Sequence, residues 1–97
     1  MGLKTRRIII TFTVGRDTSE ENLMRLCKSY RSNKYEVNDR GDFELSFSLN
    51  TVLEYNEVIH FMELIHMDME SNLTLQGIKY KGMRWTPNEA YYTEGTE

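Results

Sequence analysis

Several residue types are scarce in this sequence, and each shortage excludes a class of protein. The 97 residues include one cysteine and one proline. Because Cys27 has no second cysteine to pair with, a disulfide-stapled scaffold is excluded. No uninterrupted run of aliphatic residues is longer than Ile8–Ile10, whereas a membrane-spanning helix needs roughly 20 apolar residues. We therefore expect no contact with a membrane.

Neither sign of charge dominates the chain. The 12 lysines and arginines face 15 aspartates and glutamates, which gives a net charge of −3. This balance argues against a dedicated nucleic-acid coat, although it is compatible with a local basic patch. The first residues, Met1–Arg7, lack the apolar core of a secretory signal. Together with the unpaired Cys27, this predicts a cytoplasmic protein.

Composition and hydrophobic periodicity predict one small α+β domain. Hydrophobic residues make up 39% of the chain and charged residues 28%, which is typical of a globular protein. Apolar residues in alternation predict strands, and apolar residues at helical spacing predict amphipathic helices. The expected elements are a strand over 6–14, a helix from 18 to about 32, a hairpin over 34–50, a helix from 51 to about 70 and a strand that begins near 73.

Cap and bulge signals set the expected boundaries. Thr18 followed by Glu21 matches a capping box that begins the first helix, and Thr51 followed by Glu54 matches one that begins the second. Gly77 interrupts the apolar alternation of the last expected strand. We therefore expect a bulge at that glycine.

The element order β-α-β-β-α-β indicates a ferredoxin-like fold. A four-stranded antiparallel sheet would carry both helices on one face. Right-handed crossovers would place the strands in the order fourth, first, third, second. We assign residues 1–87 to this single domain and expect residues 88–97 to form a flexible acidic tail.

The sequence contains no recognisable motif for catalysis, a cofactor or a metal. His60 and His66 are too far apart around the second expected helix to share a metal ion. We interpret His66, which lies in an apolar stripe, as a partly buried histidine bonded to a neighbour. Cys27 lies on the buried face of the first helix, where a thiol is usually inert. We therefore expect a protein that binds a partner without catalysis, cofactor or metal.

The second expected helix has more apolar surface than one buried face requires. Its buried stripe should consist of Tyr55, Val58, Ile59, Met62, His66 and Met69. A second apolar group lies outside this stripe, on a helix that carries acids and no lysine or arginine. Such a face is typical of contact with another chain, either a second copy in a homodimer or a different protein. The alternative is that a tail or loop of the same chain folds over it, and the apolar and aromatic residues 90–92 are the candidates. The predicted partner-binding residues are Phe61, Leu64, Ile65 and Met67.

A second candidate surface is basic. In the expected strand order, the last strand lies beside the first, so their lysines and arginines converge and could bind the phosphates of a nucleic acid, RNA in particular. RNA-recognition domains use the same sheet face through stacking aromatics, but Asp42 and Glu44 stand where those aromatics would lie. Lysines on an edge strand also serve simply to discourage edge-to-edge pairing. The residues of this alternative site are Lys4, Arg6, Arg7, Lys79, Lys81, Arg84 and Trp85.

Two loops are further candidates. Arg16–Thr18 leads into the first helix, whose backbone N–H groups could hold an anion, as in a small-ligand sensor. A solvated, capped turn explains the same residues. Asn38–Asp42 contains an Arg-Gly-Asp tripeptide, which we interpret as hairpin-turn chemistry and not as a cell-adhesion motif, with Gly41 available for positive φ.

The leading hypothesis is a small regulatory or interaction protein that binds a macromolecular partner through its second helix. Small single domains without catalytic motifs are typical of accessory regulators, including those of phages and mobile elements. Nucleic-acid binding and small-ligand sensing are the alternatives. Salt separates the first two, because phosphate contacts weaken steeply with salt whereas an apolar contact barely changes.

Overall fold

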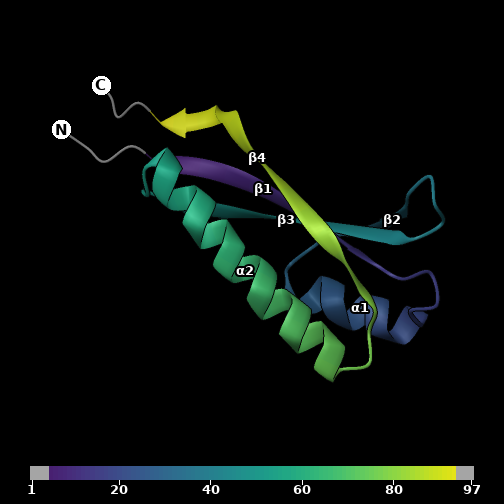
Figure 1. The fold of residues 1–97 in the computed structure, drawn as a ribbon. Helices are drawn as coiled ribbons and strands as arrows, with labels where there is room; N and C mark the ends of the chain where they lie inside the picture. The colour runs from purple at the N-terminus through teal and green to yellow at the C-terminus, as the bar shows by residue number, and fades with distance from the viewer. Residues whose placement is uncertain (1–4, 94–97) are drawn as a thin grey trace.

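A central sheet with two helices on one of its faces forms the fold (Figure 1). The computed structural model describes residues 5–93. Its elements are β1 (Thr5–Val14), α1 (Glu20–Ser29), β2 (Tyr35–Val37), β3 (Phe43–Thr51), α2 (Tyr55–Leu75) and β4 (Tyr80–Thr93). The four strands lie in the order β2-β3-β1-β4 and pair antiparallel. The predicted α+β class with a four-stranded antiparallel sheet is therefore confirmed.

β1 lies in the middle of the sheet, between β3 and β4. Its sequence is β-branched or aromatic at nearly every position, which favours an extended backbone. The side chains of Ile8, Ile10, Phe12 and Val14 alternate along it and are fully buried. Each buried side chain of this size contributes about 1.5–3 kcal/mol, so this row of four holds the sheet against the helices.

The β2–β3 hairpin follows its predicted alternation. Leu45 is buried opposite Phe12, and Phe43 and Phe47 pack against the core from the same face. Gly41 has a φ of 84° in the connecting turn, a left-handed conformation that glycine reaches without steric cost. The predicted hairpin and its glycine turn are confirmed.

Two clusters of buried side chains lie between the sheet and the helices. The first, under α1 and the last turns of α2, contains Phe12, Val14, Leu23, Leu26, Leu45, Met69, Leu73 and Ile78. The second, under the first half of α2, contains Ile8, Ile10, Val58 and Met62. Both helices therefore cover the same face of the sheet. α1 contributes no residue to the second cluster.

The beginning of α1 differs from its predicted boundary by one residue. Its N-cap is Ser19, whose hydroxyl oxygen accepts the backbone N–H of Asn22 at 3.1 Å. Thr18, the predicted cap, donates its hydroxyl to the Gly15 carbonyl at 2.6 Å instead. The predicted capping box that starts at Thr18 is therefore wrong, because Ser19 is the N-cap.

The end of α1 also differs. The helix ends at Ser29, about three residues before the predicted end near residue 32. Arg31 has a φ of 57°, and the N–H groups of Arg31 and Ser32 donate to the carbonyls of Lys28 and Cys27 at 3.4 and 2.8 Å. This pattern closes many helices and usually places glycine at the left-handed position, because other residues meet a steric cost there.

α2 begins later than predicted because β3 continues to Thr51. The helix starts at Tyr55, and the Glu57 carboxylate accepts the N–H of the N-cap residue Glu54 at 2.8 Å. Glu57 is therefore the third residue of the capping box, the position that the sequence analysis assigned to Glu54.

The last turn of α2 replaces the start of the expected final strand. Leu73 is buried four residues after Met69, so the helical spacing outweighs the short alternation of Leu73 and Leu75. Gly77 ends the helix with a φ of 78°, and the Ile78 N–H donates to the Leu73 carbonyl at 2.9 Å. The strand start at Leu73 and the bulge at Gly77 are therefore wrong.

A bulge in β4 occurs instead at Gly82. Phe12 of β1 pairs with Met83 and Val14 pairs with Tyr80, so β4 contains one extra residue between these pairs. Gly82 has a φ of 109° at this point, which requires glycine.

β4 continues past the expected end of the domain at Pro87. It reaches Thr93, which pairs with Thr5 of β1. Residues 88–93 of the expected tail therefore belong to the sheet, and residues 94–97 lie outside the described residues.

Replacing Arg31 by glycine should stabilise the fold, because glycine removes the steric cost of the left-handed conformation. We expect the Arg31→Gly variant to raise the free energy of unfolding by about 0.5–1 kcal/mol, measured by urea denaturation. Arg31→Ala is the matched control: it removes the same side chain but keeps a Cβ, and it should give no gain. Equal effects of the two substitutions would contradict this account.

Candidate functional site

The four predicted partner-binding residues of α2 divide into two pairs. Leu64 and Met67 are 64% and 61% exposed on the outer side of the helix. Phe61 and Ile65 are half-buried and pack against the core. The outer pair is therefore accessible to a partner, whereas Ile65 packs against the core and Phe61 lies at its border. Partner binding by these residues stays a prediction.

This division arises because the buried stripe of α2 is rotated from the predicted one. Val58, Met62 and Met69 are buried as expected. Tyr55 and Ile59, which were expected beside them, are exposed on the flank of α2. The helix tilts across the sheet, so the side chains that meet β1 depend on the packing angle as well as on the periodicity.

The end of the sheet that α1 does not reach is covered by α2 alone. Ten residues make α1 about 15 Å long, whereas the paired region of β1 and β3 is about 30 Å long. Leu49 and Leu53, which follow the covered part of β3, are half-buried and pack against the second cluster together with Phe61. Leu64 follows Phe61 by three residues, so these two side chains are neighbours on the surface of α2.

The charges of α2 are all of one sign. Its acids are Glu57, Glu63, Asp68 and Glu70, and its 21 residues contain no lysine or arginine. The exposed apolar residues thus lie among carboxylates. Such a surface is complementary to a partner that carries cations around an apolar centre.

The opposite flank of α2 forms a groove with β4. Its volume is about 380 Å³, and it is lined by Ile59, Met62, Glu63, His66, Met83 and Trp85. The centroids of the Tyr55 and Trp85 rings lie 6.0 Å apart, so Tyr55 packs beside this groove. His66 Nδ1 is hydrogen-bonded to the Tyr80 hydroxyl at 2.7 Å, which confirms its predicted role as a histidine bonded to a neighbour.

The Tyr80 hydroxyl keeps its proton at neutral pH. Burial, followed by the nearby charge of Glu70 and the influence of Tyr30, raises the pKa of Tyr80 to about 12. The contact between Tyr80 and His66 therefore joins β4 to α2 through a neutral hydroxyl.

Two cations of β4 in the predicted basic site have acidic partners, whereas Lys79, just before the strand, has none among the described residues. Lys81 Nζ lies 3.2 Å from the Asp42 carboxylate, and Arg84 donates to both carboxylate oxygens of Glu44 at 3.2 Å. The second pair is bidentate, which is the strongest geometry for an arginine and a carboxylate. A phosphate would have to displace these carboxylates before it could use either cation.

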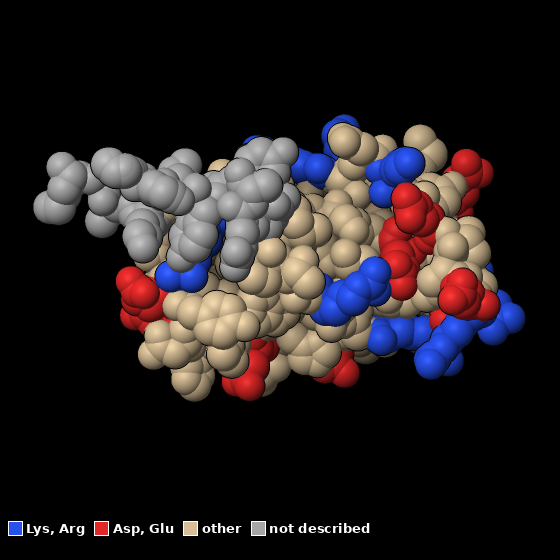
Figure 2. Space-filling view, turned by 90° about the horizontal axis from the view of Figure 1, so that it is seen from above, with Lys and Arg blue, Asp and Glu red and all other residues tan. Residues whose placement is uncertain are grey.

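The other members of the predicted basic site are scattered. Arg6 forms an ion pair with Glu54 at 3.5 Å. Arg7 donates to the side chain of Asn50 at 3.3 Å. Trp85 lines the groove beside α2 instead of the open sheet face, and Lys4 lies outside the described residues. Figure 2, which views the molecule from above, accordingly shows acidic and basic side chains next to one another.

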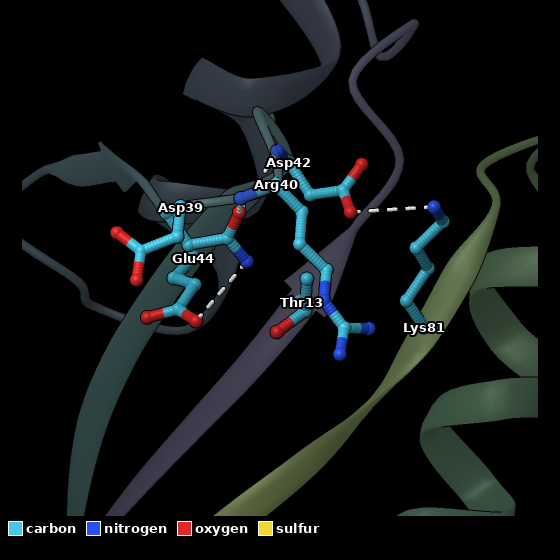
Figure 3. Close-up of a pocket in the computed structure, with 7 residues that line it drawn as sticks. Thr13, Asp39, Arg40, Asp42, Glu44 and Lys81 are labelled. Atoms are coloured by element: carbon cyan, nitrogen blue, oxygen red, sulfur yellow. Dashed lines mark hydrogen bonds and ion pairs between the residues drawn. The ribbon is translucent and has the colours of Figure 1, made fainter.

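A polar pocket occupies one end of the open sheet face (Figure 3). It has a volume of about 330 Å³ and is lined by Thr13, Asn38, Asp39, Arg40, Asp42, Glu44 and Lys81. The sequence identified the turn itself, but nothing in its pattern showed that the turn folds over β1 and β4. The one feature of the sequence that could have indicated a pocket here is the high density of charged residues around Gly41.

The Arg16–Thr18 loop uses its backbone and hydroxyl groups within the protein, whereas the exposed Arg16 guanidinium has no partner among the described residues. The Arg16 backbone N–H donates to the Asp42 carboxylate at 3.1 Å, and the Thr18 hydroxyl bonds to Gly15. The Ser19 side chain already caps the first turn of α1. The predicted anion site at this loop therefore has few donors left to offer.

Among the side chains that the structure describes, those of residues 5–87, no group of three or more from histidine, cysteine, aspartate or glutamate is arranged to hold a metal ion. No helix in the same part of the chain is long and apolar enough to cross a membrane. The chain matches no protein-family model, and no curated protein or solved structure is significantly similar to it.

The ion pairs on the sheet generate a prediction about nucleic acids. Because Lys81 and Arg84 are already neutralised, we expect no micromolar binding of labelled single- or double-stranded RNA or DNA at physiological salt, measured by fluorescence anisotropy. Micromolar binding that falls steeply with salt, and that Lys79→Glu with Lys81→Glu abolishes, would contradict this expectation.

The Glu44–Arg84 pair also predicts a pH dependence of stability. Hydrogen bonds from Arg84, with a further one from Asn38, lower the pKa of Glu44 below its ordinary value of 4.5. A lowered pKa in the folded state adds stability above pH 4.5 that is lost as the pH falls through the folded-state value.

We expect Glu44→Gln to reduce the free energy of unfolding at neutral pH by up to about 1 kcal/mol, because the pair is partly exposed. The difference between the variant and the wild type should shrink as the pH falls below 4.5. Urea denaturation at a series of pH values measures it. A difference that is independent of pH would show that the charge of Glu44 is not responsible.

Proposed function

We propose that this protein is a non-catalytic interaction protein that binds a protein partner through the outer side of α2. The observation that carries the proposal is the exposure of Leu64 and Met67 on a helix whose buried face is already complete. Leu64 follows the half-buried Phe61 by three residues and Met67 follows Leu64 by three, so successive side chains are neighbours on the helix surface. Connected surfaces of this kind favour contact with another chain.

The composition of the surface specifies the partner's chemistry. Leucine, phenylalanine and methionine supply apolar area, and methionine adapts to differently shaped partners. The carboxylates of Glu57 and Asp68, on the same helix, favour lysine or arginine at the edge of the contact. A symmetric contact of α2 with α2 of a second copy would bring acids against acids, so the charges favour a different protein.

The fold and the compartment belong to the same proposal. Counted from β4, the strand order is fourth, first, third, second, which supports a ferredoxin-like assignment. Burial raises the pKa of the Cys27 thiol, so the group stays protonated and poorly reactive. An inert, unpaired cysteine supports a cytoplasmic location.

Nucleic-acid binding is less well supported by the geometry. Its two best-placed cations, Lys81 and Arg84, are held by Asp42 and Glu44 on the same sheet face. Small-ligand sensing at Arg16–Thr18 is also less well supported, since those residues bond within their own loop and to Asp42.

Charge substitutions on α2 test the proposal. We expect Leu64→Glu and Met67→Glu each to reduce recovery of a specific partner from an extract of the source cells at least tenfold, which corresponds to about 1.4 kcal/mol. Immobilised wild type and variants would be compared by quantitative mass spectrometry. Sedimentation of the purified protein would show whether a second copy is the partner.

Met24→Glu is the matched control, because Met24 is an exposed methionine on α1, 62% exposed against 61% for Met67. This variant should keep the same partner as the wild type. Unfolding midpoints of all variants would exclude loss of structure. If Leu64→Glu and Met67→Glu retain every partner of the wild type, α2 is not the binding surface.

A further inference from the structure

The polar pocket on the open sheet face is separate from the α2 surface. The helices cover the other face of the sheet, and the pocket is formed by the β2–β3 turn together with side chains of β1, β3 and β4 (Figure 3). It is open to solvent and large enough for a small ligand, with a volume of about 330 Å³.

The turn that carries Arg40 is held in one conformation by its own hydrogen bonds. The Asn38 side-chain oxygen accepts the N–H groups of Arg40 and Asp42 at 2.9 and 3.0 Å. The Asn38 N–H donates to the Asp42 carbonyl at 2.8 Å, and Gly41 supplies the left-handed residue. The backbone of Arg40 is therefore fixed above the sheet before any ligand arrives, which lowers the entropic cost of binding.

Two of the three acids in the pocket are already satisfied. The Asp42 carboxylate is only 2% exposed and receives Lys81 Nζ at 3.2 Å and the Arg16 N–H at 3.1 Å. Glu44 receives two bonds from Arg84 and one from Asn38. Their negative charges are balanced within the protein, so they do little to repel an anion.

Arg40 is the cation of the pocket that has no such partner. Its backbone N–H bonds to Asn38, but among the described residues its guanidinium has no acid or acceptor. Figure 3 shows the guanidinium beside Thr13, on the side of the turn that faces Lys81, while the Asp39 carboxylate points away. The Thr13 hydroxyl also has no partner within residues 5–93.

We propose that this pocket binds a small anion, a carboxylate or a phosphate group, through the Arg40 guanidinium and the Thr13 hydroxyl. A guanidinium presents a planar set of donors that matches the paired oxygens of either group. Thr13 lies on the central strand and supplies a hydroxyl donor at the floor of the pocket. Lys81 stays paired with Asp42, so it neutralises that carboxylate and is not counted among the donors to the anion.

Nuclear magnetic resonance titration of the full chain tests the proposal. Inorganic phosphate and succinate would be added separately, each to about 20 mM at constant ionic strength, so that screening of charge stays fixed. We expect saturable shifts of the backbone amides of Thr13, Arg40 and Gly41 with at least one of the two anions. Saturation by phosphate alone, by succinate alone or by both identifies the anion class.

Arg40→Gln should weaken the affinity at least tenfold, and Thr13→Val severalfold, because each removes one donor from an exposed or half-buried position without touching the core. Lys79→Gln is the matched control: it removes an exposed cation near the start of β4 that does not line the pocket, and it should leave the affinity unchanged. Amide spectra and unfolding midpoints would verify the fold of each variant.

Three results would overturn the proposal. These are the absence of saturable shifts with both anions, an affinity that Arg40→Gln leaves unchanged, and an equal loss in Lys79→Gln. The last would indicate attraction to the general positive charge of this end of the sheet. None of these results bears on the α2 surface, which is tested by Leu64→Glu.

Discussion

Burial of the inner face of β1 is the constraint on which the rest of this structure depends. The strand is central, so its four buried side chains fix the position of β3 on one side and β4 on the other, and both helices pack across them. Because side chains alternate along a strand, the residues between them are forced to the opposite face. Thr11 and Thr13 thus lie on the open face, where Thr11 bonds to Ser46 at 2.8 Å and Thr13 forms part of the polar pocket.

The unequal lengths of the helices determine which apolar residues stay accessible. α1 covers only one end of the sheet, whereas α2 is twice as long and crosses both core clusters. At the end that α1 leaves open, Leu53 and Phe61 are only half-buried, and Leu64, three residues after Phe61, is exposed. The proposed binding surface is therefore a consequence of incomplete coverage, which a partner would complete.

The charged residues of the sheet are arranged in pairs and not as a continuous basic surface. Lys81 and Arg84 extend from β4 toward acids of the hairpin, and each pair joins an edge strand to the rest of the open face. Exposed pairs contribute little to stability, but the Asp42 carboxylate is buried and needs its partner. Arg40 differs from both cations because no acid in the described part of the chain neutralises it, and this difference gives the pocket its proposed preference for anions.

The sequence by itself determined the elements whose signal is local and periodic. The alternation of β1 and β3, the glycine turn of the hairpin and the succession of strands and helices along the chain all follow from side-chain spacing, and the structure confirms them. The ends of the helices were less predictable because neighbouring sequence signals compete. Leu73 continues α2 although it also begins an alternating, strand-like pattern, and Arg31 takes the left-handed conformation after α1 where glycine is usual. Only the tertiary structure decided that Ile65 is covered while Leu64 is exposed, and that Lys81 meets Asp42. These outcomes depend on packing angles and on contacts between residues far apart in the chain, and spacing along the sequence carries no information about either.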